Sequence, residues 1–227
     1  MEIISYLEKY EESWLRCRVL SFLHSAMYED VVTKKPQFEN QTAIELIAIE
    51  NDEVIGILDI LIDDESNKAT FLRKEKGAFI ELIAVHPDHQ NKGIAQKLYD
   101  EGLARLHKYK PQFIELFTRN DEAANKFYKK QGFDIECEYY VAFGIQKGLR
   151  KPIKSDFSEG LLSVTGVGED KTNYDYVIVD GKYEVYNKAG LELIDYDRYY
   201  PVYGYVKELK GSNDLVENVG QAVITSK

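Results

Sequence analysis

The apolar positions of the chain fall into short runs and helical repeats, and both patterns predict elements of regular structure. Residues 43–50 and 54–62 are apolar runs of strand length, separated by a polar turn at 51–53, which predicts a β-hairpin. Residues 78–85 form a third apolar run that holds one charge, Glu81. That run predicts a short and mostly buried strand.

Helical spacing follows the third run and returns further on. From residue 94 the apolar side chains recur on one face of a predicted helix, at Ile94, Leu98, Leu103 and Leu106. A second helix is expected over 121–131, because Asn120 or Asp121 can cap its start and Gly132 suits the position after its end. Residues 11–24 predict a further helix.

The order of these elements predicts the fold class. Additional strands are expected at 2–7, from about Ala69, at 113–118 and at 133–143. The chain is therefore rich in strands at first and then alternates strand, helix, strand, helix and strand. Such an order predicts an α/β (α+β) fold with a mixed, mainly antiparallel central sheet flanked by helices.

The last third of the chain has a different composition. Residues 150–227 hold nine of the seventeen tyrosines, and Asp180-Gly181 lies between two apolar runs, which predicts a hairpin. We expect a domain over 1–150 and a small β-rich subdomain over 151–227, with turns at 160–168 and 211–220. The tyrosines either pack a thin core or bind a ligand, a partner or a second subunit, since tyrosine offers a large area and a polar tip.

The net charge and the cysteine content bear on the expected partners and cellular location of the protein. The net charge is −10 and the pI is about 5.0, so we expect neither a nucleic-acid partner nor a membrane-surface partner, which would favour a basic patch. The charged N-terminus does not resemble a signal peptide. The chain has two cysteines, Cys17 and Cys137, which are too few for a disulfide framework. We therefore predict a cytoplasmic protein with reduced thiols.

The segment between the third apolar run and its helix carries the clearest chemistry. A helix start leaves N–H groups unpaired and has partial positive charge, so a loop that bends into it suits a phosphate. Gly93 lets the main chain approach a bulky anion, Ala95 is too small to shield the amides, and Lys92 adds positive charge. The spacing is neither that of a P-loop nor that of a dinucleotide fingerprint.

Gln-x-x-Gly-x-Ala at 90–95 resembles the acetyl-CoA pyrophosphate loop of the GNAT superfamily of N-acetyltransferases. The run at 120–133, Asn-x-x-x-x-Asn-x-Phe-Tyr-x-x-x-Gly-Phe, is similar to a second motif of that family. The resemblance covers about residues 1–146. It implies the GNAT fold and acetyl-CoA as co-substrate. His86 and His89 flank Asp88, but His-Pro-Asp-His at 86–89 is more simply a turn than a metal site, so no metal is expected. The family's usual seventh strand is not obvious, so either the strand at 133–143 is bent into two or the last third supplies it.

The resemblance also implies the site residues. The cofactor would contact the strand end, the loop and the second helix, at Ala84, Val85, Gln90, Asn91, Lys92, Gly93, Ile94, Ala95, Asn120, Asn125 and Tyr128. The N–H of Val85 would stabilise the oxyanion, and Tyr128 would protonate the leaving thiolate. Helix packing for Tyr128 and helix capping for Asn120 and Asn125 are the structural alternatives.

The sequence leaves alternatives open for the general base and for the site of the acceptor amine. Glu81 is the only carboxylate in the central strand, and it either takes the proton of the amine or forms a structural ion pair or substrate anchor. Residues 25–40 either shape the acceptor site or connect two elements. We predict an N-acetyltransferase that acts on a small-molecule or peptide primary amine by direct transfer. The alternatives are a silent acyl-CoA-binding module and an interaction protein, with homodimer formation through the last third.

Overall fold

The computed structural model describes residues 1–146, 152–158, 161–167, 173–179 and 182–209. The chain packs into two units, which are described separately. The first comprises residues 1–116 and 206–209, and the second comprises the described residues of 117–205. The predicted boundary at residue 150 falls outside the described residues and stays a prediction. No helix in the described part of the chain is long and apolar enough to cross a membrane.

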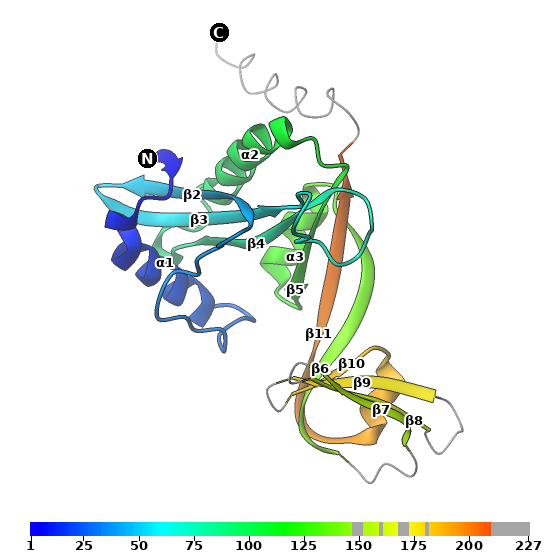
Figure 1. Cartoon of the computed structure of the whole chain (residues 1–227). Coiled ribbons are helices and arrows are strands. Elements are labelled where there is room, and N and C mark those ends of the chain that lie inside the picture. Colours follow the sequence, from blue (N-terminus) through cyan, green and yellow to red (C-terminus); the bar gives the residue numbers. More distant parts are fainter. Residues whose placement is uncertain (147–151, 159–160, 168–172, 180–181, 210–227) are drawn as a thin grey trace. The chain divides into compact units, whose positions relative to one another are not determined.

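The first unit is a mixed sheet with a helix on each face (Figure 1). Its strands are β1 (Glu2–Ser5), β2 (Thr42–Glu50), β3 (Glu53–Ile62), β4 (Gly77–Val85) and the start of β5 (Phe113–Arg119), in that order across the sheet. The pairs β1–β2, β2–β3 and β3–β4 are antiparallel, whereas β4 and β5 run parallel. The predicted mixed and mainly antiparallel sheet is confirmed.

The two helices of this unit pack closely because the sheet side chains alternate between its faces. Helix α1 (Glu11–Leu23) buries Trp14 and Phe22 against Ile47 and Ile57 on one face. Helix α2 (Ile94–Leu106) lies on the other face (Figure 1). An added Cβ at Gly102 would come within 2.6 Å of Leu58 Cδ2, so a glycine is needed where α2 crosses β3.

The hairpin between β2 and β3 is confirmed, and it turns without glycine. Asn51 and Asp52 have φ values of 53° and 64°, both in the left-handed region. Asparagine and aspartate tolerate this region better than most residues, and two such residues in succession match the right-handed twist of the flanking strands.

The strand predicted from Ala69 is wrong. Residues 63–76 form an irregular loop that is fixed by the Asp63 carboxylate. One of its oxygens accepts hydrogen bonds from the N–H groups of Ala69 and Thr70, and the other accepts from Thr70 Oγ1 and the N–H of Gly77. These N–H groups are therefore bonded to the Asp63 carboxylate and not to a neighbouring strand, so the segment forms a loop.

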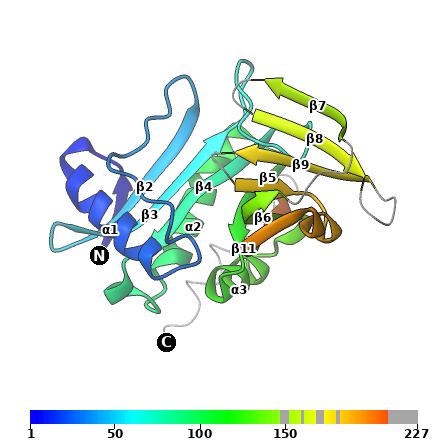
Figure 2. The same ribbon diagram turned by 90° about the horizontal axis from the view of Figure 1, so that it is seen from below.

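The second unit contains α3 (Glu122–Lys130), β6 (Asp134–Gln146), β7 (Pro152–Ser158), β8 (Leu161–Val167), β9 (Asn173–Val179), β10 (Lys182–Val185) and residues 194–205 of β11 (Ile194–Glu208), with a 3-10 turn at Lys188–Leu193. The strand order is β11, β6, β10, β9, β8, β7, with the last residues of β5 beside β11. Figure 2 shows β7, β8 and β9 side by side.

The last third contains the predicted hairpin but not all of the predicted turns. Strands β9 and β10 pair antiparallel with Lys182 opposite Val179, as the predicted hairpin requires; its turn residues Asp180 and Gly181 lie outside the described residues. The turn region predicted at 160–168 is wrong for 161–167, which form β8. The turn predicted at 211–220 lies outside the described part.

The last third supplies the seventh strand of the family pattern. Strand β11 lies next to β6 in the sheet, and β6 is continuous over Asp134–Gln146 rather than bent into two strands. Gly144 permits the contact, because an added Cβ would approach the carbonyl oxygen of Asp195 to 2.1 Å. The β-rich segment is thus inserted between β6 and β11, and the chain returns to the sheet after it.

Candidate active site

Strand β4 loses its parallel partner halfway along its length. Registered pairs between β4 and β5 are confined to Gly77, Ala78 and Phe79, which pair with residues 113–115. The second half of β4, including Ala84 and Val85, has registered partners only on β3 in the described structure. The main chain at this end of β4 is therefore not paired with β5.

Glu81 is the extra residue of a β-bulge. Asp59 of β3 lies opposite Leu82, and Ile60 lies opposite Ile80, so Glu81 has no counterpart on β3. Bulges bend a strand and redirect a side chain, and they are common beside active sites. The Glu81 side chain is exposed, unlike the buried side chains of Ile80 and Leu82 on either side.

The electrostatic surroundings of Glu81 come from α1 and the loop that follows it. Desolvation raises the pKa of the Glu81 carboxyl, the Asp30 carboxylate raises it further, and the Arg18 guanidinium lowers it. Arg18 is buried and is held by Asp30, with Nη2 2.9 Å from Oδ2 and Nη1 donating to the Asp30 carbonyl at 2.9 Å. A carboxyl with a raised pKa is suited to accept a proton near neutral pH.

The loop after β4 is held by its own side chains. A short 3-10 turn, Pro87–His89, follows the strand, and the N–H of Asp88 donates to His86 Nδ1 at 3.3 Å. Gln90 Nε2 donates to the Val85 carbonyl at 3.3 Å, and Lys92 Nζ donates to the Asp88 carbonyl at 3.1 Å. His86 and His89 lie in the expected turn. The described residues contain no group of three His, Cys, Asp or Glu that could hold a metal ion.

Gly93 begins α2 in a conformation that favours glycine. Its φ is +75°, and an added Cβ would meet no protein atom within 4 Å. The position therefore needs glycine for its backbone angle, and the space beside it is open. The first turn of α2 has no acidic residue, and buried Ile94 anchors it while Gln90, Asn91, Lys92 and Gly93 are exposed.

The second motif forms α3 in the second unit. Asp121, rather than Asn120, caps the helix, since its carboxylate accepts from the N–H of Ala124 at 2.9 Å. Asn120 is exposed directly before it. Asn125 Nδ2 donates to the carbonyls of Arg119 and Asp121 at 2.7 and 2.6 Å, so its side chain supports the start of the helix.

Tyr128 is buried in an aromatic cluster. It lies 5.9 Å from Phe133 and 6.0 Å from Tyr205 between ring centroids. Burial is the main cause that raises the pKa of its phenol, which stays protonated at neutral pH. Tyr205 on β11 also donates from Oη to Asn125 Oδ1 at 2.8 Å. Sequence reasoning missed Tyr205, because no local motif links it to a helix that lies about 80 residues earlier.

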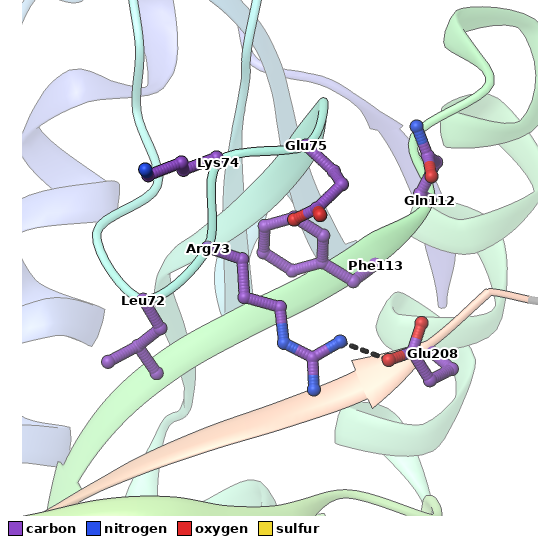
Figure 3. Close-up of a pocket in the computed structure, with 7 residues that line it drawn as sticks. All are labelled: Leu72, Arg73, Lys74, Glu75, Gln112, Phe113 and Glu208. Carbon is purple, nitrogen blue, oxygen red and sulfur yellow. Dashed lines mark hydrogen bonds and ion pairs between the residues drawn. The ribbon is translucent and has the colours of Figure 1, made fainter.

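The residues predicted to bind and act thus lie in two groups. Ala84, Val85, Glu81 and the loop 90–95 belong to the first unit, whereas Asn120, Asn125 and Tyr128 belong to the second. A pocket of about 490 Å³ in the first unit contains none of them. Figure 3 shows its lining, with an ion pair between Arg73 and Glu208.

Solved structures share this fold. A protein from Streptococcus mutans UA159 is 18% identical with a TM-score of 0.52, and the match covers 92% of this chain and 100% of that one. Naa20 from Chaetomium thermophilum, solved with a bisubstrate analogue, is 15% identical with a TM-score of 0.50, covering 92% and 87%. A tandem GNAT protein from the clavulanic acid biosynthesis pathway is 9% identical with a TM-score of 0.55, covering 93% and 99%.

These low identities establish the fold alone, and no curated protein matches the chain. The family model of the acetyltransferase (GNAT) family matches residues 5–133, which is more than half of the chain. That range includes the bulged strand β4, the loop at 90–95 and helix α3. The chain therefore belongs to the acetyltransferase (GNAT) family.

Proposed function

We propose that the protein is an acetyl-CoA-dependent N-acetyltransferase that moves an acetyl group to a primary amine by direct transfer in a ternary complex. The observation that carries this proposal is the start of α2. A loop with open space beside Gly93 leads into a helix whose first turn has no acidic residue. Such a helix start binds phosphate through its free N–H groups.

In this proposal the donor is held by main chain. The amides of residues 90–95 bind the pyrophosphate, and Lys92 adds positive charge. The unpaired half of β4 at Ala84 and Val85 binds the pantetheine arm as an added strand would. The N–H of Val85 then donates to the thioester carbonyl and stabilises the oxyanion.

Glu81 accepts the proton that the amine loses as its nitrogen attacks the thioester carbonyl. The exposed bulge position and the raised pKa of the Glu81 carboxyl support this assignment. The C–N bond forms, the C–S bond breaks, and the thiolate takes a proton from the Tyr128 phenol. Tyr128 is assigned as the acid because its place in the second motif matches the tyrosine that the family resemblance puts beside the thiol, and its phenol is protonated at neutral pH.

Asn120 and Asn125 stay predictions as cofactor contacts. Asn125 uses both ends of its side-chain amide within the protein, which favours a supporting role for this residue. We also propose a small-molecule or peptide amine as acceptor, a cytoplasmic location, and no nucleic-acid or membrane partner. The inserted β-rich segment is the candidate surface for a homodimer.

The test is an incubation of the protein with acetyl-CoA and a panel of amines, followed by measurement of free thiol and of CoA binding by calorimetry. We expect CoA binding and amine-dependent thiol release. CoA binding without thiol release from any amine would favour the alternative of a silent acyl-CoA-binding module. Absence of both would remove the proposal.

A further inference from the structure

A buried lysine ammonium lies in a cage of aromatic rings on the α1 face of the first unit. Lys35 is 2% exposed, in the loop between α1 and β2. Its Nζ lies 4.8 Å from the ring centroid of Tyr6, 5.5 Å from that of Trp14 and 5.0 Å from that of Phe38. Distances below about 6 Å allow cation–π attraction. The rings form a site for an alkylammonium group.

Two carboxylates lie at this cage, and Lys35 donates a hydrogen bond to only one of them. Its Nζ forms ion pairs with Glu45 Oε1 and with Asp59 Oδ2, but the 3.9 Å to Asp59 Oδ2 is too long for a hydrogen bond. Asp59 is 1% exposed, and its Oδ1 has no hydrogen-bond partner in the described structure. Buried polar atoms are rarely left unpaired. The cage therefore holds more acceptors than the tethered lysine uses.

Lys35 also fixes its own segment of the loop. Within residues 32–37, which are all described, the hydrogen bonds are those of Lys35: its N–H donates to Glu11 Oε1 at 3.2 Å, and its Nζ donates to Glu45 and to the Pro36 carbonyl. If another ammonium took the place of Nζ, the side-chain anchor of this segment would be lost. The occupant of the cage and the position of the segment are thus coupled.

The cage is on the same sheet face as the candidate base. Glu45 of β2 lies directly opposite Asp59 of β3, and Asp59 lies opposite Leu82, the residue after the bulged Glu81. Burial is the largest cause of the raised pKa of the Asp59 carboxyl, and the Glu81 carboxylate is near enough to raise that pKa further. The backbones of neighbouring strands are about 4.8 Å apart, so Asp59 and Glu81 are separated by on the order of one strand spacing. A short aliphatic diamine spans such a distance, with one nitrogen at Glu81 and the other in the cage.

We propose that the cage of Tyr6, Trp14, Phe38, Glu45 and Asp59 binds the second ammonium of a cationic acceptor amine, and that Lys35 is an internal occupant which this ammonium displaces. The inference rests on the proposed acetyltransferase function and names its substrate class as short aliphatic diamines. A free ammonium has three donors and no tether, so it can donate hydrogen bonds to both carboxylates, whereas Lys35 donates one to Glu45 and none to Asp59.

The first test uses the wild-type protein and does not depend on catalysis. The Hε and Cε NMR signals of Lys35 are measured with putrescine and with sodium chloride at equal ionic strength. Putrescine is expected to shift these signals, because Lys35 leaves the aromatic rings of the cage. Unchanged Lys35 signals under saturating putrescine would overturn the proposal.

The second test compares putrescine with n-butylamine, a monoamine of the same chain length, in the thiol-release assay. The wild-type protein is expected to prefer putrescine in kcat/KM. Lys35→Met is expected to lower the KM for putrescine about tenfold, because a competing occupant has been removed. Lys34→Met is the matched control, since Lys34 is exposed and carries the same charge; it should leave the KM unchanged.

The outcomes separate this inference from the proposed function. Thiol release with equal preference for both amines and no effect of Lys35→Met would overturn the diamine site and leave the acetyltransferase intact. Shifted Lys35 signals without thiol release from any amine would support the cage and contradict the catalytic proposal. If Lys35→Met does not fold, the NMR experiment on the wild-type protein decides.

Discussion

The variant Gly93→Ala tests two reasons for glycine at the start of α2: its left-handed backbone angle, which affects stability, and the open space beside it, which affects CoA binding. The φ of +75° costs a residue with a side chain roughly 1–2 kcal/mol, and about 0.4–1 kcal/mol is regained because alanine restricts the unfolded chain. The new Cβ meets no protein atom within 4 Å, so no steric term is added. We expect a net loss of stability of about 1 kcal/mol, which lowers Tm by roughly 2–4 °C for a chain of this size.

The effect on CoA should be larger than the effect on folding. In the proposed function, the methyl group would occupy the open space through which the pyrophosphate approaches the N–H groups of residues 92–95. The loss of one charge-assisted hydrogen bond costs roughly 1.5–3 kcal/mol, which corresponds to about a 10- to 100-fold weaker Kd. Calorimetric titration of CoA into the folded variant measures this change.

Gly132→Ala is the matched control for backbone strain. Gly132 has a φ of +81° and follows the end of α3, outside the loop at 90–95. Its substitution should lower Tm by a similar amount and leave CoA affinity unchanged. If Gly93→Ala binds CoA as tightly as the wild-type protein does, the main-chain pyrophosphate site is in the wrong place.

Three further predictions concern catalysis and thiols. Tyr128→Phe should reduce kcat about 100-fold at unchanged CoA affinity, as expected for a lost general acid; equal turnover would leave Tyr128 a packing residue. Because the pKa of Glu81 is raised above its ordinary value, kcat/KM should fall as pH falls through that raised value, and Glu81→Gln should abolish this limb and most of the rate. An unchanged profile in that variant would exclude Glu81 as the base. Burial raises the pKa of the Cys17 thiol to about 12, so a thiol reagent at pH 8 should modify only Cys137 in the native protein and both cysteines after unfolding; rapid loss of both in the native state would contradict this burial.

The sequence predicted the part of the fold that local patterns encode. Helix α2 was expected from the apolar spacing that begins at Ile94, and α3 from its capping residues and Gly132. The hairpin at 51–52 was expected even without glycine. In each case the information lies within a few neighbouring residues, so no tertiary contact was needed to read it.

The missing parts depend on contacts between distant residues. The bulge at Glu81 exists only in relation to the register of β3. The burial of Lys35 depends on rings from Tyr6 just after β1, from α1 and from its own loop. In the sequence, Lys34-Lys35-Pro36 is typical of an exposed connecting loop, so its pattern does not predict a buried lysine. Strand β11 lies next to β6 in the sheet, but the inserted β-rich segment separates the two strands in the sequence. No local pattern therefore shows that they pair.

The most direct measurement is a titration of isotope-labelled protein with CoA, followed through the amide NMR signals. Binding of the pyrophosphate at the start of α2 and of the pantetheine arm along β4 predicts the largest shifts at Lys92, Gly93, Ile94, Ala95 and Val85. Saturation with CoA that leaves these five amides unchanged, or a protein that does not bind CoA at all, would contradict the account.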